Sequence, residues 1–141
     1  MTINEYFGDW TKVIDLKEAD KIKNYLQGKR ICPLLKNVFS CFRYCPFNDL
    51  RVVILGYDPY PNIINNQPVA TGIAFANPKE TIEDNYSPSL KVIKESINHY
   101  LNPWENINFD PSLESWEKQG ILMLNTALSC LMGNTGSHSL L

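Results

Sequence analysis

The amino-acid sequence predicts an α/β protein in which helices flank a parallel sheet. Two continuous apolar runs, 52–55 (VVIL) and 121–124 (ILML), carry the predicted strands. Both runs are short and bordered by a glycine, Gly56 after the first and Gly120 before the second, which is typical of a fully buried strand. Segments with helical spacing precede and separate the runs, and strands that alternate with helices form parallel sheets.

Two helices are expected before the first strand. Residues 11–27 place apolar side chains at roughly helical spacing, and Gly28 is the expected end of this helix. A second, shorter helix is expected over 34–42, ending near Pro46, because proline interrupts a helix.

Two further helices are expected between the strands. Ser87 begins one of them with Pro88 at its first position, and the helical pattern continues to about residue 101. A Pro/Asn-rich loop follows, and the next helix opens at Asp110 and is closed by Gly120. Neither an internal repeat nor a long linker divides the sequence, so one domain over 1–141 is expected.

The composition excludes several classes of protein. Apolar residues make up 44% of the chain and charged residues 20%, as in a soluble globular protein. No apolar run approaches the ~20 residues of a membrane span, and the N-terminal MTINEYFGDW does not resemble a signal peptide. We therefore expect a cytoplasmic location and no membrane partner.

The net charge of −2 counts mildly against nucleic-acid binding. It does not exclude a local positive face, because phosphate contacts need only a few well-placed cations and backbone N–H groups. The candidates are Lys29, Arg30, Arg43 and Arg51, with solvated surface charge as the alternative for each.

The four cysteines predict no metal site. Cys32, Cys41, Cys45 and Cys130 form neither CxxC pairs nor a Cys/His metal spacing. Reduced, partly buried thiols are the expected state in a cytosolic protein.

One acidic side chain follows the first predicted strand. Asp58 lies between Tyr57 and Pro59, at the C-terminal end of the strand, where ligands collect in open α/β sheets. Pro59 and Pro61 fix φ and remove two backbone donors, so the turn is stiff. The alternative is an ordinary strand-to-loop turn with a solvated Asp58.

Four segments resemble the family 1 uracil-DNA glycosylases. VVILGYDPYP (52–61) is similar to the family's VVILGQDPYH, and TGIAF (71–75) is similar to HGLCF. SPSL (87–90) resembles the PPSL loop, and WEKQGILMLNT (116–126) resembles WxxQGVLLLNT. The segments occur in the family's order and at familiar spacing, and the resemblance covers nearly all of the chain.

The resemblance implies a uracil-DNA glycosylase-like fold and a DNA-repair activity. Members hydrolyse the N-glycosidic bond of deoxyuridine in DNA and release uracil, which is the first step of base-excision repair. The implied partners are uracil-containing DNA and uracil, and no cofactor is implied.

Hydrolysis of this bond passes through an oxocarbenium-like transition state. It needs a carboxylate that positions water and opposes positive charge on the sugar, and donors that stabilise the departing base. The resemblance gives the catalytic role to Asp58 and substrate-binding roles to Tyr57, Tyr60, Phe75 and Asn125.

The substrate-binding roles differ in kind. The Asn125 amide suits the N3–H and O4 of uracil, whereas cytosine shows the opposite pattern. Phe75 resembles the aromatic residue that stacks on the base, and Tyr60 resembles the one that excludes the thymine methyl. Ser87 and Ser89 are expected to contact the DNA backbone. The alternatives are an Asn that satisfies a turn, a core Phe, and a Tyr packed on the prolines.

Three features depart from the family pattern. Tyr57 replaces a glutamine that acts partly through its backbone N–H, and Pro61 replaces a histidine beside the catalytic loop. The HPSPLS motif, which supplies an electrophilic histidine and a leucine that enters the duplex, does not occur in the sequence. His138 falls at the position of the family's structural histidine. It is not expected to take the role of the electrophilic histidine.

By comparison with members of the family, the chain is expected to be an N-terminal portion that lacks the C-terminal strands. The alternative function is a DNA- or replication-associated binding module with a glycosylase fold and no turnover. A generic nucleotide-binding domain is less favoured, because no glycine-rich phosphate loop is present. We further expect the strand at 121–124 to lack a partner on one side, which favours self-association and weak catalysis.

Overall fold

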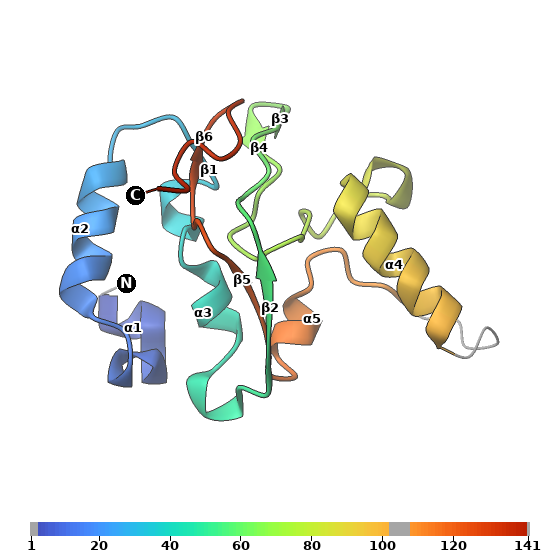
Figure 1. Cartoon of the computed structure of the whole chain (residues 1–141), viewed down its shortest axis with the longest axis horizontal. Helices are drawn as coiled ribbons and strands as arrows, with labels where there is room; N and C mark the ends of the chain where they lie inside the picture. The colour runs from blue at the N-terminus through green and yellow to red at the C-terminus, as the bar shows by residue number, and fades with distance from the viewer. Residues whose placement is uncertain (1–2, 102–107, 141) are drawn as a thin grey trace.

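The computed structural model describes residues 3–101 and 108–140 (Figure 1). The α-helices are α1 (Ile3–Phe7), α2 (Leu16–Leu26), α3 (Ser40–Tyr44), α4 (Pro88–Tyr100) and α5 (Glu114–Glu117). The strands are β1 (Ile31–Cys32), β2 (Val52–Gly56), β3 (Ile63–Ile64), β4 (Gln67–Pro68), β5 (Ile121–Asn125) and β6 (Cys130–Leu131). Most of the expected Pro/Asn-rich loop, 102–107, lies outside the described residues.

The two predicted strands pair in parallel at the centre of the molecule. β2 and β5 run in register from Val52↔Ile121 to Gly56↔Asn125. The prediction of a parallel α/β sheet is therefore confirmed, and the described residues give it two strands. Because the strands are parallel, their C-terminal ends meet at one edge.

Helices cover both faces of this strand pair (Figure 1). On one face, Leu122 packs in a cluster with Phe7, Trp10 and Cys41 from the N-terminal segments and α3. On the other face, Met123 packs in a cluster that includes Leu90 of α4. Alternate side chains of a strand point to opposite faces, so these neighbouring residues of β5 join two separate clusters.

The expectation that residues 52–55 are fully buried is wrong. Val52, Val53 and Leu55 are 49%, 46% and 60% exposed, whereas Leu122 and Met123 of β5 are buried. Within the described residues, β2 has one strand partner, β5, and its other edge is unpaired. In the same part of the chain β5 also has a strand partner on one side only, as expected, but the uncovered apolar side chains lie on β2.

The N-terminal helices are shorter than expected. α2 begins only at Leu16, because the Asp15 side chain accepts the backbone N–H of Lys17 at 2.8 Å and caps the helix. Residues 8–12 form a separate 3₁₀ helix. The helix expected over 34–42 divides into a 3₁₀ turn, Leu35–Asn37, and α3.

Of the two helices between the strands, α4 has the predicted extent and α5 does not. The Asp110 carboxylate accepts the N–H groups of Ser112 at 3.0 Å and Ser115 at 3.1 Å, which holds the chain in a turn. Leu113 then adopts a left-handed φ of 53° immediately before α5. A helix starting at Asp110 cannot contain this residue, so only Glu114–Glu117 is helical.

Two short antiparallel pairs were not predicted. β1 pairs with β6, placing Cys32 opposite Cys130, and β3 pairs with β4 through a turn at Asn65 and Asn66. Both turn residues have positive φ, as the favoured two-residue hairpin turn requires. Across residues 3–101 and 108–140 no helix is long and apolar enough to cross a membrane.

Candidate active site

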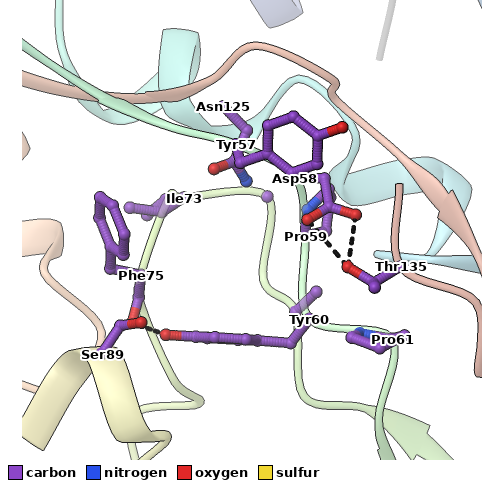
Figure 2. A pocket seen from close by; sticks show the side chains of 12 residues that line it. Tyr57, Asp58, Pro59, Tyr60, Pro61, Ile73, Phe75, Ser89, Asn125 and Thr135 are labelled. Atoms are coloured by element: carbon purple, nitrogen blue, oxygen red, sulfur yellow. Dashed lines mark hydrogen bonds between the residues drawn. The ribbon is translucent and has the colours of Figure 1, made fainter. Parts of the chain in front are cut away.

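A cavity of about 200 Å³ opens at the C-terminal edge of β2 and β5 (Figure 2). This is below the roughly 300–1,000 Å³ of pockets for drug-sized ligands, and it suits a ligand the size of one nucleobase. The lining residues are Tyr57, Asp58, Pro59, Tyr60, Pro61, Ala70, Gly72, Ile73, Phe75, Ser89, Asn125 and Thr135. The structure thus brings Asp58, Tyr60, Phe75 and Asn125 around one cavity, as the strand-end positions predict.

Asp58 enters the cavity from the loop that follows β2. Its carboxylate is half-buried and accepts hydrogen bonds from the Thr135 hydroxyl and from the Gly136 backbone N–H. Both donors belong to a segment far along the chain, 77 and 78 positions from Asp58. The carboxylate is therefore held in place by donors on a distant segment.

Asn125 is the last residue of β5 and lies beside Gly56, the last residue of β2. A Cβ on Gly56 would lie 2.2 Å from the Asn125 Oδ1 and 3.3 Å from the Ala74 Cβ. The amide therefore occupies space that only a glycine leaves open. The pairing of the two strands fixes the position of the amide in the cavity.

The aromatic residues hold each other in place across the cavity. The Tyr60 hydroxyl donates a hydrogen bond to the Phe75 carbonyl at 3.0 Å, and Tyr60 lies opposite Asn125 in Figure 2. Burial raises the pKa of Tyr60, so its phenol stays protonated and remains a donor. Phe75 has a left-handed φ of 65°, which is strained for a bulky residue and is often found at binding sites.

No family model matches the chain. The chain is 40% identical over 138 residues to a uracil-DNA glycosylase of Buchnera aphidicola, covering 92% of this chain and 59% of the relative. It is 33% identical over 129 residues to uracil-DNA glycosylase 1 of Listeria monocytogenes, covering 89% of this chain and 52% of the relative.

The chain is thus similar to uracil-DNA glycosylases over about nine-tenths of its own length.

The comparison with solved structures identifies the fold. The crystal structure of mimivirus uracil-DNA glycosylase superposes with a TM-score of 0.74 at 27% identity, over 99% of this chain and 51% of that one. The chain therefore has a uracil-DNA glycosylase fold, and it spans about half the length of the relatives that it matches.

The two serines expected at the DNA backbone lie in different surroundings. Ser89 is exposed and lines the cavity. Ser87 is not among the lining residues. Its hydroxyl accepts a hydrogen bond of 2.7 Å from the side-chain amide of the buried Asn77. The contact of Ser89 with DNA stays a prediction, whereas Ser87 braces its own loop.

Tyr57 lies at the rim of the cavity. Its side chain is 64% exposed, and its carbonyl accepts the Thr126 hydroxyl at 2.8 Å and the Ala127 N–H at 3.0 Å. These bonds join the chain after β2 to the chain after β5. The backbone of Tyr57 is thus fixed while its side chain remains accessible from solvent.

Two buried thiols support the loop at 57–61, which follows β2. The Cys130 Sγ donates to the Pro59 carbonyl at 3.4 Å, and the Cys32 Sγ lies 3.6 Å from the Pro61 carbonyl. Burial raises the pKa of Cys130 to about 12, so the thiol is protonated and can donate. In residues 3–101 and 108–140 no three His, Cys, Asp or Glu side chains are grouped to hold a metal.

Thr135 and Gly136 are site residues that the sequence analysis missed. They are 77 and 78 positions from Asp58, in a turn that carries no helical or strand pattern. His138 is buried near this turn and shares a 2.9 Å hydrogen bond with the Ser129 hydroxyl. Burial, with Lys29 nearby, lowers the pKa of His138, as suits a neutral structural histidine.

Substituting Gly56→Ala is expected to weaken uracil binding by about 10-fold or more, because the new methyl group displaces the Asn125 amide. Binding of free uracil, measured by protein NMR titration, checks this. The control is the same substitution in an Asn125→Ala background, where the clashing amide is absent and the additional loss should be small. Equal losses in both backgrounds would show that Gly56 does not act through Asn125.

Proposed function

We propose that this chain carries the base-recognition and hydrolytic site of a uracil-DNA glycosylase. The reaction is hydrolysis of the N-glycosidic bond of deoxyuridine in DNA, with release of uracil for base-excision repair. The observation that carries the proposal is the position of Asp58 and Asn125 at the ends of two paired strands, around a base-sized cavity. The names of its relatives support the same reaction.

Asp58 would serve the sugar side of the reaction. A carboxylate there holds the attacking water and opposes the positive charge that develops on the deoxyribose as the bond to the base breaks. The bonds from Thr135 and Gly136 fix the direction of this group, so no reorganisation is needed in the transition state.

Asn125, Tyr60 and Phe75 would serve the base side. The amide donates one hydrogen bond and accepts one, which suits the O4 and N3–H of uracil and not the reversed pattern of cytosine. The Tyr60 ring is anchored through Phe75, so it can exclude a methyl group at the base's C5. Phe75 offers an aromatic face for stacking on a base extruded from the helix.

DNA would approach the rim where Ser89 and Tyr57 are exposed. Phosphate contacts at Ser89 position the strand without reading its sequence, and the cavity then selects the base. All four cysteines are free, in keeping with our proposal that the protein works in the reducing cytoplasm.

The test is release of uracil from single- and double-stranded oligonucleotides that contain one deoxyuridine. We expect uracil release with a chelator present, and it is detected as strand breaks at the resulting abasic site after alkali treatment. Matched oligonucleotides with thymine or cytosine at the same position should stay intact. Tight binding of the uracil oligonucleotide without base release would instead favour the alternative, a DNA-binding module without turnover.

We also propose that the chain self-associates through the uncovered edge of β2. Val53 and Leu55 are exposed, and an unpaired strand edge is a template for another strand. Leu55→Glu is expected to shift the chain to monomer in sedimentation velocity, because it places a charge in the contact. Val92→Lys, at an exposed apolar residue of α4, is the matched control and should leave the association unchanged. A monomeric unsubstituted chain would contradict the proposal.

A further inference from the structure

The Asp58 carboxylate is held by one turn of the chain. The Thr135 Oγ1 lies 3.1 Å from the Asp58 Oδ1 and 2.9 Å from the Oδ2, so its single proton is shared between both oxygens (Figure 2). The Gly136 backbone N–H donates to the same Oδ2. Hydrogen bonds to a charged acceptor are stronger than neutral ones, so this pair of donors is suited to fix the carboxylate plane.

The turn that supplies these donors is itself braced. The Gly133 N–H donates to the Pro61 carbonyl at 2.9 Å, which ties the turn to the far end of the catalytic loop. The Ser137 hydroxyl donates to the Asn134 carbonyl at 2.8 Å and accepts the Leu131 N–H at 2.7 Å. Thr135 is therefore presented to Asp58 from a defined position, although its own side chain is exposed.

Two residues of the loop that follows β2 cannot donate to Asp58. Pro59 and Pro61 lack N–H groups, and their side chains are apolar. The turn approaches Asp58 on the side away from Phe75 in Figure 2, which leaves the carboxylate open toward the base-binding part of the cavity.

We propose that Thr135 is a positioning residue for Asp58. Its hydroxyl, together with the Gly136 N–H, sets the orientation in which the carboxylate meets water and the sugar. This inference rests on the proposed function for its effect on rate, and on the hydrogen bonds alone for its effect on structure. Thr135 acts through Asp58, so its loss should reduce kcat while leaving KM nearly unchanged.

The kinetic test compares two substitutions in the full chain. Thr135→Val keeps the shape of the side chain and removes the hydroxyl, and we expect kcat for uracil release to fall about 10- to 100-fold. Thr135→Ser restores the hydroxyl and should return kcat to within about 3-fold of the unsubstituted chain. Thr11→Val removes a hydroxyl bonded to the Gly8 carbonyl at 2.9 Å, far from the cavity, and should change nothing.

A structural test separates this inference from the proposed function. Hydrogen exchange of the Gly136 amide, followed by NMR, should be about 10-fold faster in Thr135→Val and unchanged in Thr135→Ser. If the unsubstituted chain releases no uracil, the proposed function is contradicted. The exchange rate of the Gly136 amide hydrogen then shows by itself whether Thr135 holds Asp58. If kcat is unchanged in Thr135→Val, or if the chain is inactive and Gly136 exchanges equally in all variants, the positioning role is wrong.

Discussion

Substituting Asp58→Asn is expected to lower the single-turnover rate of uracil release by roughly 100- to 10,000-fold. The neutral amide cannot oppose the positive charge on the sugar. An Asn amide with its oxygen at the Oδ2 position can still accept hydrogen bonds from the Thr135 hydroxyl and the Gly136 N–H, so the substitution removes the charge and keeps the position. The loss of rate therefore measures the effect of the charge.

The rate should be measured with enzyme in excess over a uracil-containing oligonucleotide, which detects slow chemistry. Asp20→Asn, at an exposed position of α2, is the matched control and should keep the unsubstituted rate. If Asp58→Asn released uracil as fast as the unsubstituted chain, Asp58 would have no part in the chemical step.

The free energy of unfolding is expected to fall as pH rises through neutrality, because of Glu117. This side chain is fully buried, its Oε1 accepts the Met123 N–H at 3.3 Å, and its Oε2 has no partner in the described parts of the chain. Burial, with a smaller contribution from the charge of Glu114, raises the pKa of Glu117 to about 9 from 4.5. The folded chain thus holds a proton that the unfolded chain releases.

The sign of the pH effect follows from these two values. Below about pH 4.5 Glu117 is protonated in both states, so its contribution to stability is fully present. Between pH 4.5 and 9 the unfolded state gains stability by ionising, and the free energy of unfolding falls by at most about 1.4 kcal/mol per pH unit. Above pH 9 the folded state ionises as well, and the loss levels off.

Denaturant unfolding at pH values between about 5 and 8 measures this slope, which could total about 4 kcal/mol over the range. Glu117→Gln removes the titrating group and should flatten the profile. Glu18→Gln, an exposed substitution that breaks an ion pair with Lys21, should retain the slope of the unsubstituted chain. A slope that survives in Glu117→Gln would assign the pH dependence to another group.

The core of the site could be predicted from sequence because it depends on local patterns. The apolar runs before Asp58 and Asn125 identify parallel strands, and parallel strands bring the residues after them to one edge. The aromatic and serine positions came from the resemblance, and Phe75, Tyr60 and Ser89 do line the cavity.

The remaining features depend on contacts between distant segments. Thr135 reaches Asp58 only because the turn after β6 folds back over the loop at 57–61. No repeating pattern in the sequence predicts such a contact. β1 and β6 are two residues long, too short for an alternating pattern to appear. The exposure of Val53 and Leu55 was missed because an apolar run indicates a tendency to be buried, without indicating what covers it.

The register of β2 and β5 has a consequence for how this site tolerates insertions and deletions. Gly56 lies opposite Asn125, and side chains alternate between faces along each strand. Losing one residue inside β5 would turn Asn125 away from the cavity and present a neighbour from the opposite face. The chain that joins the two strands supplies Phe75 and Ser89 to the same cavity, and the Ala74 N–H donates to the Met123 carbonyl of β5 at 3.0 Å. The relative positions of Asp58 and Asn125 are therefore set by the register of two strands.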